Sequence, residues 1–187
     1  QVLSAPDAVT QSYYDDKGGQ WAYYEWNAAG SFSVELSGGL VWVLCVGGGD
    51  GGYASDALNA AGGQPGLVNE GLWEFGPGTH TVTVGKAGVM GNLNNVELMS
   101  RPSSIGDYGT QGLVTWGEQQ TGRGATANAD GTGYKSLITG DELEYAPGTQ
   151  GPKRPGRAGR AVSQVAEPGT VIIAPRIDVR TLPRAPP

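Results

Sequence analysis

The stretch Ser31-Phe-Ser-Val-Glu-Leu-Ser-Gly-Gly-Leu-Val-Trp-Val-Leu-Cys-Val46 contains two different strand patterns separated by a pair of glycines. From Ser31 to Ser37, apolar residues alternate with Ser and Glu, which is typical of a strand with one buried face. From Leu40 to Val46 every residue is apolar, and the run is β-branched, aromatic and too short for a helix. It therefore predicts a strand that is buried on both faces.

Strand patterns recur along the rest of the chain. Thr79 to Gly85 predicts a strand with His80, Val82 and Val84 on one face and three threonines on the other. The other predicted strands are Gly71 to Phe75, Leu113 to Trp116, Val171 to Ala174 and a lead-in strand or two within residues 1–30. Because we find no helical periodicity, we expect an all-β fold with a compact, β-sandwich-like framework.

Glycine is the most unusual feature of the composition. It makes up 33 of 187 residues, about 18%, against an average near 7% in proteins. Since glycine adds no apolar surface and loses much backbone entropy on folding, close backbone packing, backbone hydrogen bonds or neighbouring subunits must offset the loss. Several glycines recur at every third position, as in Gly85, Gly88 and Gly91. That is the period of polyproline II, in which a crowded axis admits only glycine. We expect long Gly-rich loops with short polyglycine-II-like segments.

Charge divides the chain near residue 152. Residues 1–151 have a net charge of −11, and residues 152–187 have a net charge of +5. A basic tail can bind nucleic acid, or it can lie on the acidic body of its own or a neighbouring subunit. The tail has no aromatic residue for base stacking and the sequence pI is about 4.7, so we favour the second interpretation and expect no nucleic-acid partner.

We divide the chain into lead-in strands at residues 1–30, a glycine-rich β domain at 31–177 and an extended C-terminal arm at 178–187. The arm and the end of the domain carry Arg176, Arg180 and Arg184, which we expect to contact another subunit. No apolar run approaches the ~18 residues of a membrane helix, so we expect no membrane insertion.

Residues with catalytic potential are few. Cys45 lies inside an apolar strand, where a small buried hydrophobe is the expected role. His80 is the only histidine and alternates with valines, so we expect it to pack within its strand. Asp141-Glu142-x-Glu144 is typical of a solvated acidic turn. We therefore expect no metal site and no catalytic triad.

One motif has the spacing of a dinucleotide-binding site. Gly47-x-Gly49-x-x-Gly52 follows the buried strand, and Glu70 lies near the position of a ribose-binding carboxylate. The motif needs a following helix whose N-terminus holds the pyrophosphate. Residues 53–61 do not predict such a helix, because the segment is short, contains polar side chains and is followed by two more glycines. We therefore expect neither a cofactor nor an enzyme, and a dinucleotide-binding enzyme remains a distant alternative.

Several elements in a fixed order resemble the glycine-rich domain of tailed-phage minor tail and tail-tip proteins. They are Phe32-Ser-Val34, Val41-Trp-Val-Leu-Cys-Val-Gly-Gly-Gly49, Gly76-Pro-Gly-Thr-His-Thr-Val-Thr-Val-Gly-Lys-Ala-Gly88, Ser103-Ser-Ile-Gly106 followed by Leu113-Val-Thr115, and Gly169-Thr-Val-Ile-Ile-Ala-Pro-Arg176. The resemblance spans about residues 30–177. It implies a structural protein of the virion tail, contacts with other tail proteins, a symmetric oligomer for which we favour a trimer, and host attachment in some members.

A glycan-binding adhesin module is the alternative function. Tyr53, Tyr108, Trp116 and Tyr134 lie in or beside Gly-rich loops, where exposed rings could stack on host-surface glycan. The competing interpretation is that these rings fill the core of a chain with few aliphatic residues, and for Trp116, which lies in a predicted strand, we favour the core.

Overall fold

The computed structural model describes residues 1–14, 18–49, 53–54, 60–61, 65–88, 102–109, 119–121, 133–147, 151–157 and 166–175, with the backbone alone for 53–54, 60–61 and 119–121. The described residues form strands, turns and extended segments, with no helix among them. Accordingly, none of these residues belongs to a helix that could span a membrane.

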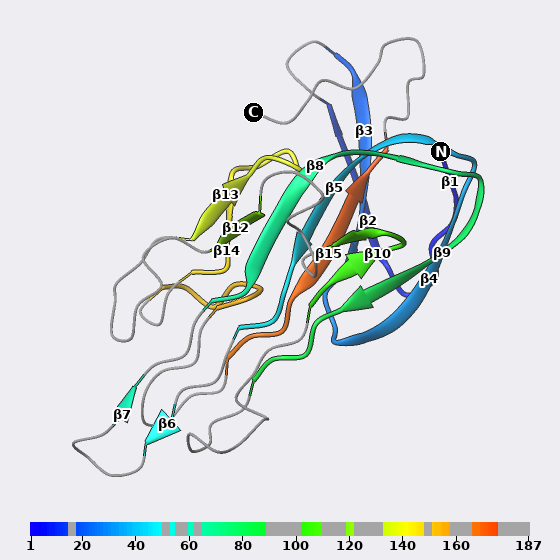
Figure 1. The fold of residues 1–187 in the computed structure, drawn as a ribbon. Coiled ribbons are helices and arrows are strands. Elements are labelled where there is room, and N and C mark those ends of the chain that lie inside the picture. The colour runs from blue at the N-terminus through cyan, green and yellow to red at the C-terminus, as the bar shows by residue number, and fades with distance from the viewer. Residues whose placement is uncertain are drawn as a thin grey trace.

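Two antiparallel sheets make up the framework (Figure 1). The five-stranded sheet has the order β1 (Val2–Ser4), β4 (Gly30–Leu36), β9 (Gly78–Val84), β10 (Ser104–Ile105), β11 (Tyr108–Gly109). The six-stranded sheet has the order β12 (Gln119–Thr121), β8 (Leu67–Phe75), β5 (Gly39–Val46), β15 (Thr170–Ala174), β3 (Gln20–Trp26), β2 (Val9–Tyr14).

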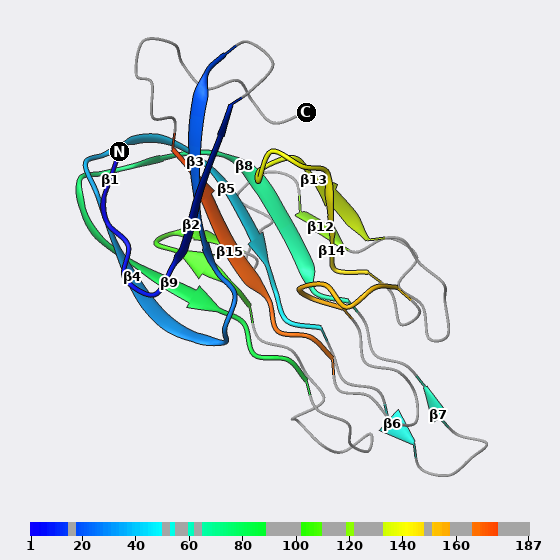
Figure 2. The ribbon, with the colours of Figure 1, turned by 180° about the vertical axis from the view of Figure 1, so that it is seen from behind.

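Two hairpins complete the described strands. β13 (Tyr134–Ser136) pairs with β14 (Leu143–Tyr145), and β6 (Tyr53–Ala54) pairs with β7 (Ala60–Ala61). Seen from behind, β2 and β3 form one edge of the six-stranded sheet (Figure 2). The chain crosses between the two large sheets at the turns from β4 to β5 and from β8 to β9.

The main core lies between the two large sheets. It contains the inward side chains of β4 and β9 from one sheet and those of β3, β5 and β15 from the other, with Phe75, Ile105 and Tyr108 at its end. Val34, Val43 and Val82 have no exposed surface. The predicted alternation in β4 and β9 is therefore confirmed, because these strands turn one face to this core and the other to solvent.

A second core covers the opposite face of the six-stranded sheet. There the outward side chains of β5 and β15, including Trp42, Leu44 and Ile172, pack against Ile138 and Tyr145 from the segment that contains β13 and β14. β5 thus has apolar neighbours on both faces, as its continuous apolar sequence predicts. Only its first side chain, Leu40, is exposed, at 43%.

The predicted all-β, sandwich-like framework is confirmed. The strands predicted at 31–37, 40–46, 71–75, 79–85 and 171–174 correspond to β4, β5, β8, β9 and β15. The lead-in residues form three strands, and these belong to both large sheets. The strand predicted at 113–116 lies outside the described residues.

Candidate functional site

Glycine-rich segments extend beyond the ends of the strands and run side by side (Figures 1 and 2). We call this feature the glycine bundle and define it as residues 47–49, 65–67, 85–88, 155–157 and 166–169. The three residues 47–49 are fully buried, as are most of the other glycines of the bundle. The segments continue β5, β9 and other strands, so the sandwich determines where each of them begins.

The bundle is hydrogen-bonded on more than two sides. Segment 166–169 makes five backbone hydrogen bonds to three different neighbours, with lengths from 2.8 to 3.3 Å: Gly49 N to Glu167 O, Gly156 N to Pro168 O, Glu167 N to Arg157 O, Ala166 N to Gly88 O and Gly169 N to Gly85 O. A strand within one sheet has only two hydrogen-bonded neighbours. Three neighbours agree with the polyglycine-II-like segments that the sequence predicts.

Close backbone contact explains why these positions are glycine. A Cβ at Gly48 would overlap the carbonyl oxygen of Lys86, and a Cβ at Gly49 would overlap that of Arg157. The same holds for Gly66 against the carbonyl oxygen of Gly47. Gly47 and Gly49 of the apparent dinucleotide motif therefore lie against other backbones, so no phosphate could approach them from that side. Gly52 lies outside the described residues.

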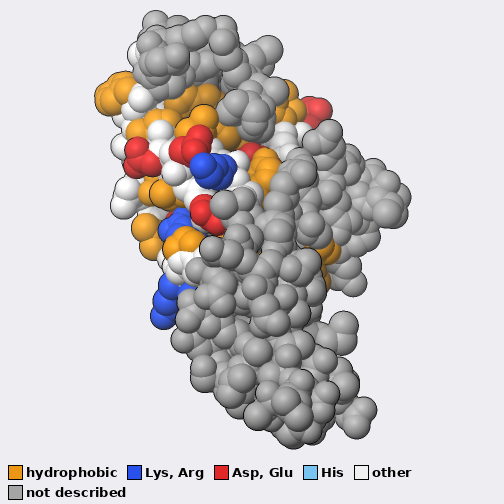
Figure 3. Space-filling view, turned by 90° about the vertical axis from the view of Figure 1, so that its left-hand side faces the viewer, with side chains coloured by type: hydrophobic (Ala, Val, Ile, Leu, Met, Phe, Trp, Pro, Cys, Tyr) orange, Lys and Arg blue, Asp and Glu red, His pale blue; other side chains and the backbone are white. Residues whose placement is uncertain are grey.

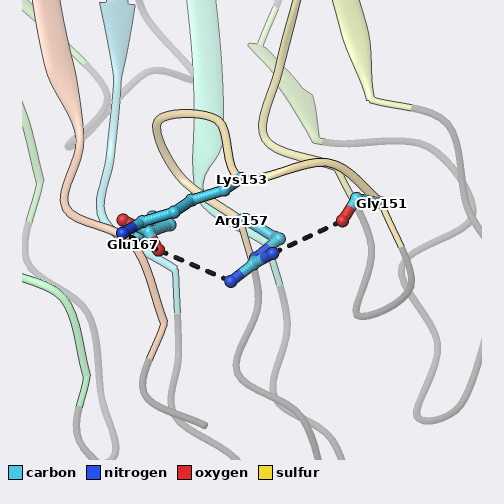
Figure 4. A network of polar contacts seen from close by, with 4 residues as sticks. All are labelled: Gly151, Lys153, Arg157 and Glu167. Carbon is cyan, nitrogen blue, oxygen red and sulfur yellow. Dashed lines mark hydrogen bonds and ion pairs between the residues drawn. The ribbon is translucent and has the colours of Figure 1, made fainter.

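An ion pair between Arg157 and Glu167 joins two segments of the bundle (Figure 4). Arg157 Nη2 lies 3.4 Å from Glu167 Oε1, and Arg157 Nη1 donates to the carbonyl oxygen of Gly151 at 3.5 Å. The two side chains are only 12% and 18% exposed. Lys153 reaches the same carboxylate from solvent at 4.0 Å. The pair therefore joins segment 155–157 to segment 166–169 from a mostly buried position.

The first part of the basic segment contacts other parts of the same chain. Besides the Arg157 pair, Arg154 Nε donates to the carbonyl oxygen of Glu144 at 2.9 Å, and its guanidinium lies 5.0 Å from the ring centre of Tyr145. On the described part of the face in Figure 3, acidic and basic side chains lie close together among hydrophobic ones. Arg176, Arg180 and Arg184 lie outside the described residues, so their contact with another subunit stays a prediction.

Glu70 connects the six-stranded sheet to the β13–β14 hairpin. Its carboxylate accepts hydrogen bonds from Trp42 Nε1 at 3.2 Å, from the Tyr134 hydroxyl at 2.7 Å and from the Ser136 hydroxyl. Burial raises the pKa of Glu70, and the three hydrogen bonds oppose this shift. Glu70 therefore holds the hairpin on the sheet, which is a structural role different from the ribose contact that the motif offered.

A polar groove lies where the β8–β9 turn meets the β10–β11 turn. It has a volume of about 390 Å³ and is lined by Trp73, Glu74, Phe75, Gly76, Thr79, His80, Thr81, Gly106 and Asp107. The His80 ring packs edge-on against Phe75 with 5.2 Å between ring centres, and Nε2 lies 2.8 Å from the carbonyl oxygen of Gly76. His80 is thus packed in its strand, as predicted, while its ring borders the groove.

Of the four predicted glycan-binding rings, the structure describes those of Tyr108 and Tyr134. Tyr108 is 2% exposed and belongs to the main core, which corrects its expected role because a stacking platform needs an exposed face. Tyr134 is partly buried against Glu70. Tyr53 is described by its backbone alone, in β6, and Trp116 lies outside the described residues.

Sequence reasoning missed the groove. Its aromatic wall, Trp73, was assigned only to a strand, and Asp107 lies in a turn that belongs to a different part of the sequence. The nearest available signal was the pair of Gly-containing turns at 76–78 and 106–107. Nothing in their sequences shows that β9 pairs with β10 and so brings the turns together.

No group of three or more His, Cys, Asp and Glu side chains suited to a metal ion occurs in the part of the chain that the structure describes. Cys45 has no exposed surface, and burial raises its pKa well above the usual range. A thiol of this kind is unreactive. Cys45 belongs to the main core.

The family model of the glycine-rich domain matches residues 26–172. No curated protein matches the chain. Since the family model covers most of the sequence, the chain belongs to the glycine-rich domain family, and the matched range contains β4 to β14, the glycine bundle and most of β15.

Proposed function

We propose that this member of the glycine-rich domain family is a structural component of a phage virion, a minor tail or tail-tip protein that acts in assembly and host attachment. The observation that carries the proposal is the glycine bundle. Its buried backbones bond to neighbours on three sides, as segment 166–169 does. Such a feature makes an extension of the sandwich rigid, and rigidity suits a part of a larger assembly.

The partners in this proposal are other tail proteins and further copies of the same chain, with a trimer favoured. The order of strand and glycine elements that resembles tail proteins supports this location, and so does the continuity of the bundle with both large sheets. In an assembly, neighbouring subunits can add to the stability that a glycine-rich chain gains from its own small core.

Immunoelectron microscopy tests the location. Antibodies raised against the purified chain are applied to tailed-phage particles isolated from the source of the sequence. We expect label at the tail or its tip, and none when the antibodies are first absorbed with the purified chain. Label confined to the capsid, or particles without label after mild denaturation exposes buried epitopes, would contradict the proposal.

The enzyme alternative has its own test. A dinucleotide that bound at Gly47 to Gly49 would have to displace backbone contacts of the bundle, such as the hydrogen bond from Gly49 N to Glu167 O. We therefore expect NAD and FAD to leave the thermal unfolding midpoint unchanged. A concentration-dependent increase with either cofactor would favour the enzyme.

A further inference from the structure

The groove between the β8–β9 and β10–β11 turns has the dimensions of a ligand site. Its volume of about 390 Å³ falls within the ~300–1,000 Å³ typical of small-molecule sites. The connected sheet positions both walls, because β10 pairs with β9 through Thr83 and Val82, and Gly106 N donates to the Thr81 carbonyl oxygen at 2.9 Å. The groove is therefore held open by the fold itself.

The charge of the lining limits the class of ligand. Glu74 and Asp107 supply two exposed carboxylates, and none of the lining residues that the structure describes is Lys or Arg. An anionic ligand such as a phosphate or a sialylated glycan would be repelled by these carboxylates. The groove fits a ligand that is uncharged or positively charged.

The hydrogen-bonding groups of the lining suit hydroxyls. Thr79 and Thr81 border the groove, but their side chains lie on the strand face opposite to that of His80. Because a carbonyl oxygen can only accept, the contact with Gly76 assigns the proton of neutral His80 to Nε2. Nδ1 is then an acceptor, and with the two carboxylates it offers several acceptors for hydroxyl groups.

An aromatic wall supplies apolar surface beside these polar groups. Trp73 is partly buried, and its ring lies 5.6 Å from that of Tyr108 with an angle of 51° between the planes. Tyr108 is itself fixed in the core. The indole is therefore supported from behind, and an aromatic ring with nearby polar groups is the usual composition of a site for an amphipathic ligand.

We propose that this groove binds an uncharged saccharide, with Trp73 as the apolar platform and His80 and Asp107 as hydrogen-bonding groups. The proposal deepens the proposed function by naming the chemical class of the attachment ligand, and it rests on that function only for the source of the sugar. A saccharide combines apolar C–H faces with many hydroxyls, which is the combination that this lining can satisfy. A cationic amine would use the carboxylates and the indole but leave the His80 acceptor without a role.

Saturation-transfer NMR on the full chain tests the proposal. The probes are a panel of the neutral sugars lactose, cellobiose and chitobiose, with 3′-sialyllactose as the anionic probe and choline as the cationic probe. We expect at least one neutral disaccharide to receive saturation, and the anionic probe to receive none. Choline alone giving a signal, or no neutral sugar giving one, would overturn the proposal.

Variants show whether a bound sugar lies in this groove. Asp107→Asn changes an exposed side chain that borders the groove, so the variant should fold as the wild type does. Loss of a hydrogen bond to a charged group should weaken binding about tenfold or more for Asp107→Asn. Asp141→Asn changes an exposed acid in the turn after β13 and is the matched control, with no effect expected.

Two further results complete the test. Trp73→Leu should abolish the signal, and circular dichroism reports whether this variant still folds. Equal binding by the wild type and Asp107→Asn would overturn the assignment to this groove. The binding measurements use the isolated chain, so their failure would contradict sugar binding but not the location in the virion. A failure of antibody labelling would contradict the location in the virion but not sugar binding.

Discussion

Gly49 marks a point where two backbones touch. Its amide donates to the Glu167 carbonyl oxygen at 3.0 Å, and its α-carbon faces the carbonyl oxygen of Arg157 so closely that a Cβ would overlap it. A side chain here would have to move a whole segment of the bundle. The residue is therefore constrained by its neighbours in space, which belong to sequence more than a hundred positions away.

Gly49→Ala should accordingly destabilise the fold. Overpacking of this kind costs roughly 1–3 kcal/mol, and we expect at least that loss in the free energy of unfolding measured by urea denaturation. Gly76→Ala is the matched control, because a Cβ at Gly76 meets nothing within 4 Å. We expect its effect to stay within about 0.5 kcal/mol. Equal effects of the two substitutions would refute the close-contact explanation.

Glu70 should make stability depend on pH. Burial raises its pKa above the usual 4.5, so the folded chain holds the proton more tightly than the unfolded chain does. Its contribution to stability is then full below a pH of about 4.5 and is lost as the pH rises through the raised pKa. In Glu70→Gln, the free energy of unfolding should therefore fall less between mildly acidic and neutral pH.

Urea denaturation at a series of pH values measures this difference. Glu35→Gln changes an exposed carboxyl on β4 and should leave the pH profile as it is in the wild type. Burial also raises the pKa of Glu25, so part of the slope should remain in every variant. Parallel profiles for the wild type and Glu70→Gln would show that Glu70 is not the titrating group.

At the scale of elements, the glycine bundle depends on a few side chains that join its segments. The pair of Arg157 and Glu167 is the clearest case, because both side chains are mostly buried. The two residues belong to different segments of the bundle, 155–157 and 166–169. Buried pairs can cost as much in desolvation as they gain in attraction. The coupling between them is therefore the quantity to measure.

A double-mutant cycle with Arg157→Met and Glu167→Gln isolates that coupling. We expect a favourable coupling energy of about 0.5–3 kcal/mol, as for residues in direct contact. The control cycle uses Lys135 and Glu142, an ion pair at 3.2 Å whose side chains are 59% and 58% exposed. Exposed pairs contribute about 0.2–1 kcal/mol, so a smaller coupling is expected there. A zero coupling for the buried pair would remove its proposed role.

The predictability of each element followed from its periodicity. β4, β5, β9 and β15 were predictable because alternation or a continuous apolar run extends over four residues or more. β13 and β14 have three residues each, too few to show a period, and they are held by Glu70 and the second core. The groove was not predictable because it depends on the pairing of β9 with β10, and Tyr108 was misassigned because its burial comes from the same pairing.

At the scale of the whole molecule, the fold combines a sandwich with two apolar cores and a bundle of glycine-rich backbones that continues its strands. In this combination, backbone hydrogen bonds and close backbone contacts join the segments of the bundle with few side chains. Hydrophobic side chains also remain exposed at the edge of the six-stranded sheet. On the edge strand β2, Val9 is 46% exposed and Tyr14 is 71% exposed, and another subunit could cover them. These properties favour a protein that works as a repeated part of an assembly.

Native mass spectrometry of the purified full chain tests that central claim most directly. We expect a homo-oligomer, with a trimer favoured, that persists on dilution through the micromolar range and separates into folded or unfolded single chains when collisional energy is raised. A strict monomer at every concentration, in a chain shown to be folded by circular dichroism, would contradict the claim that the protein functions as a self-associating component of a larger structure.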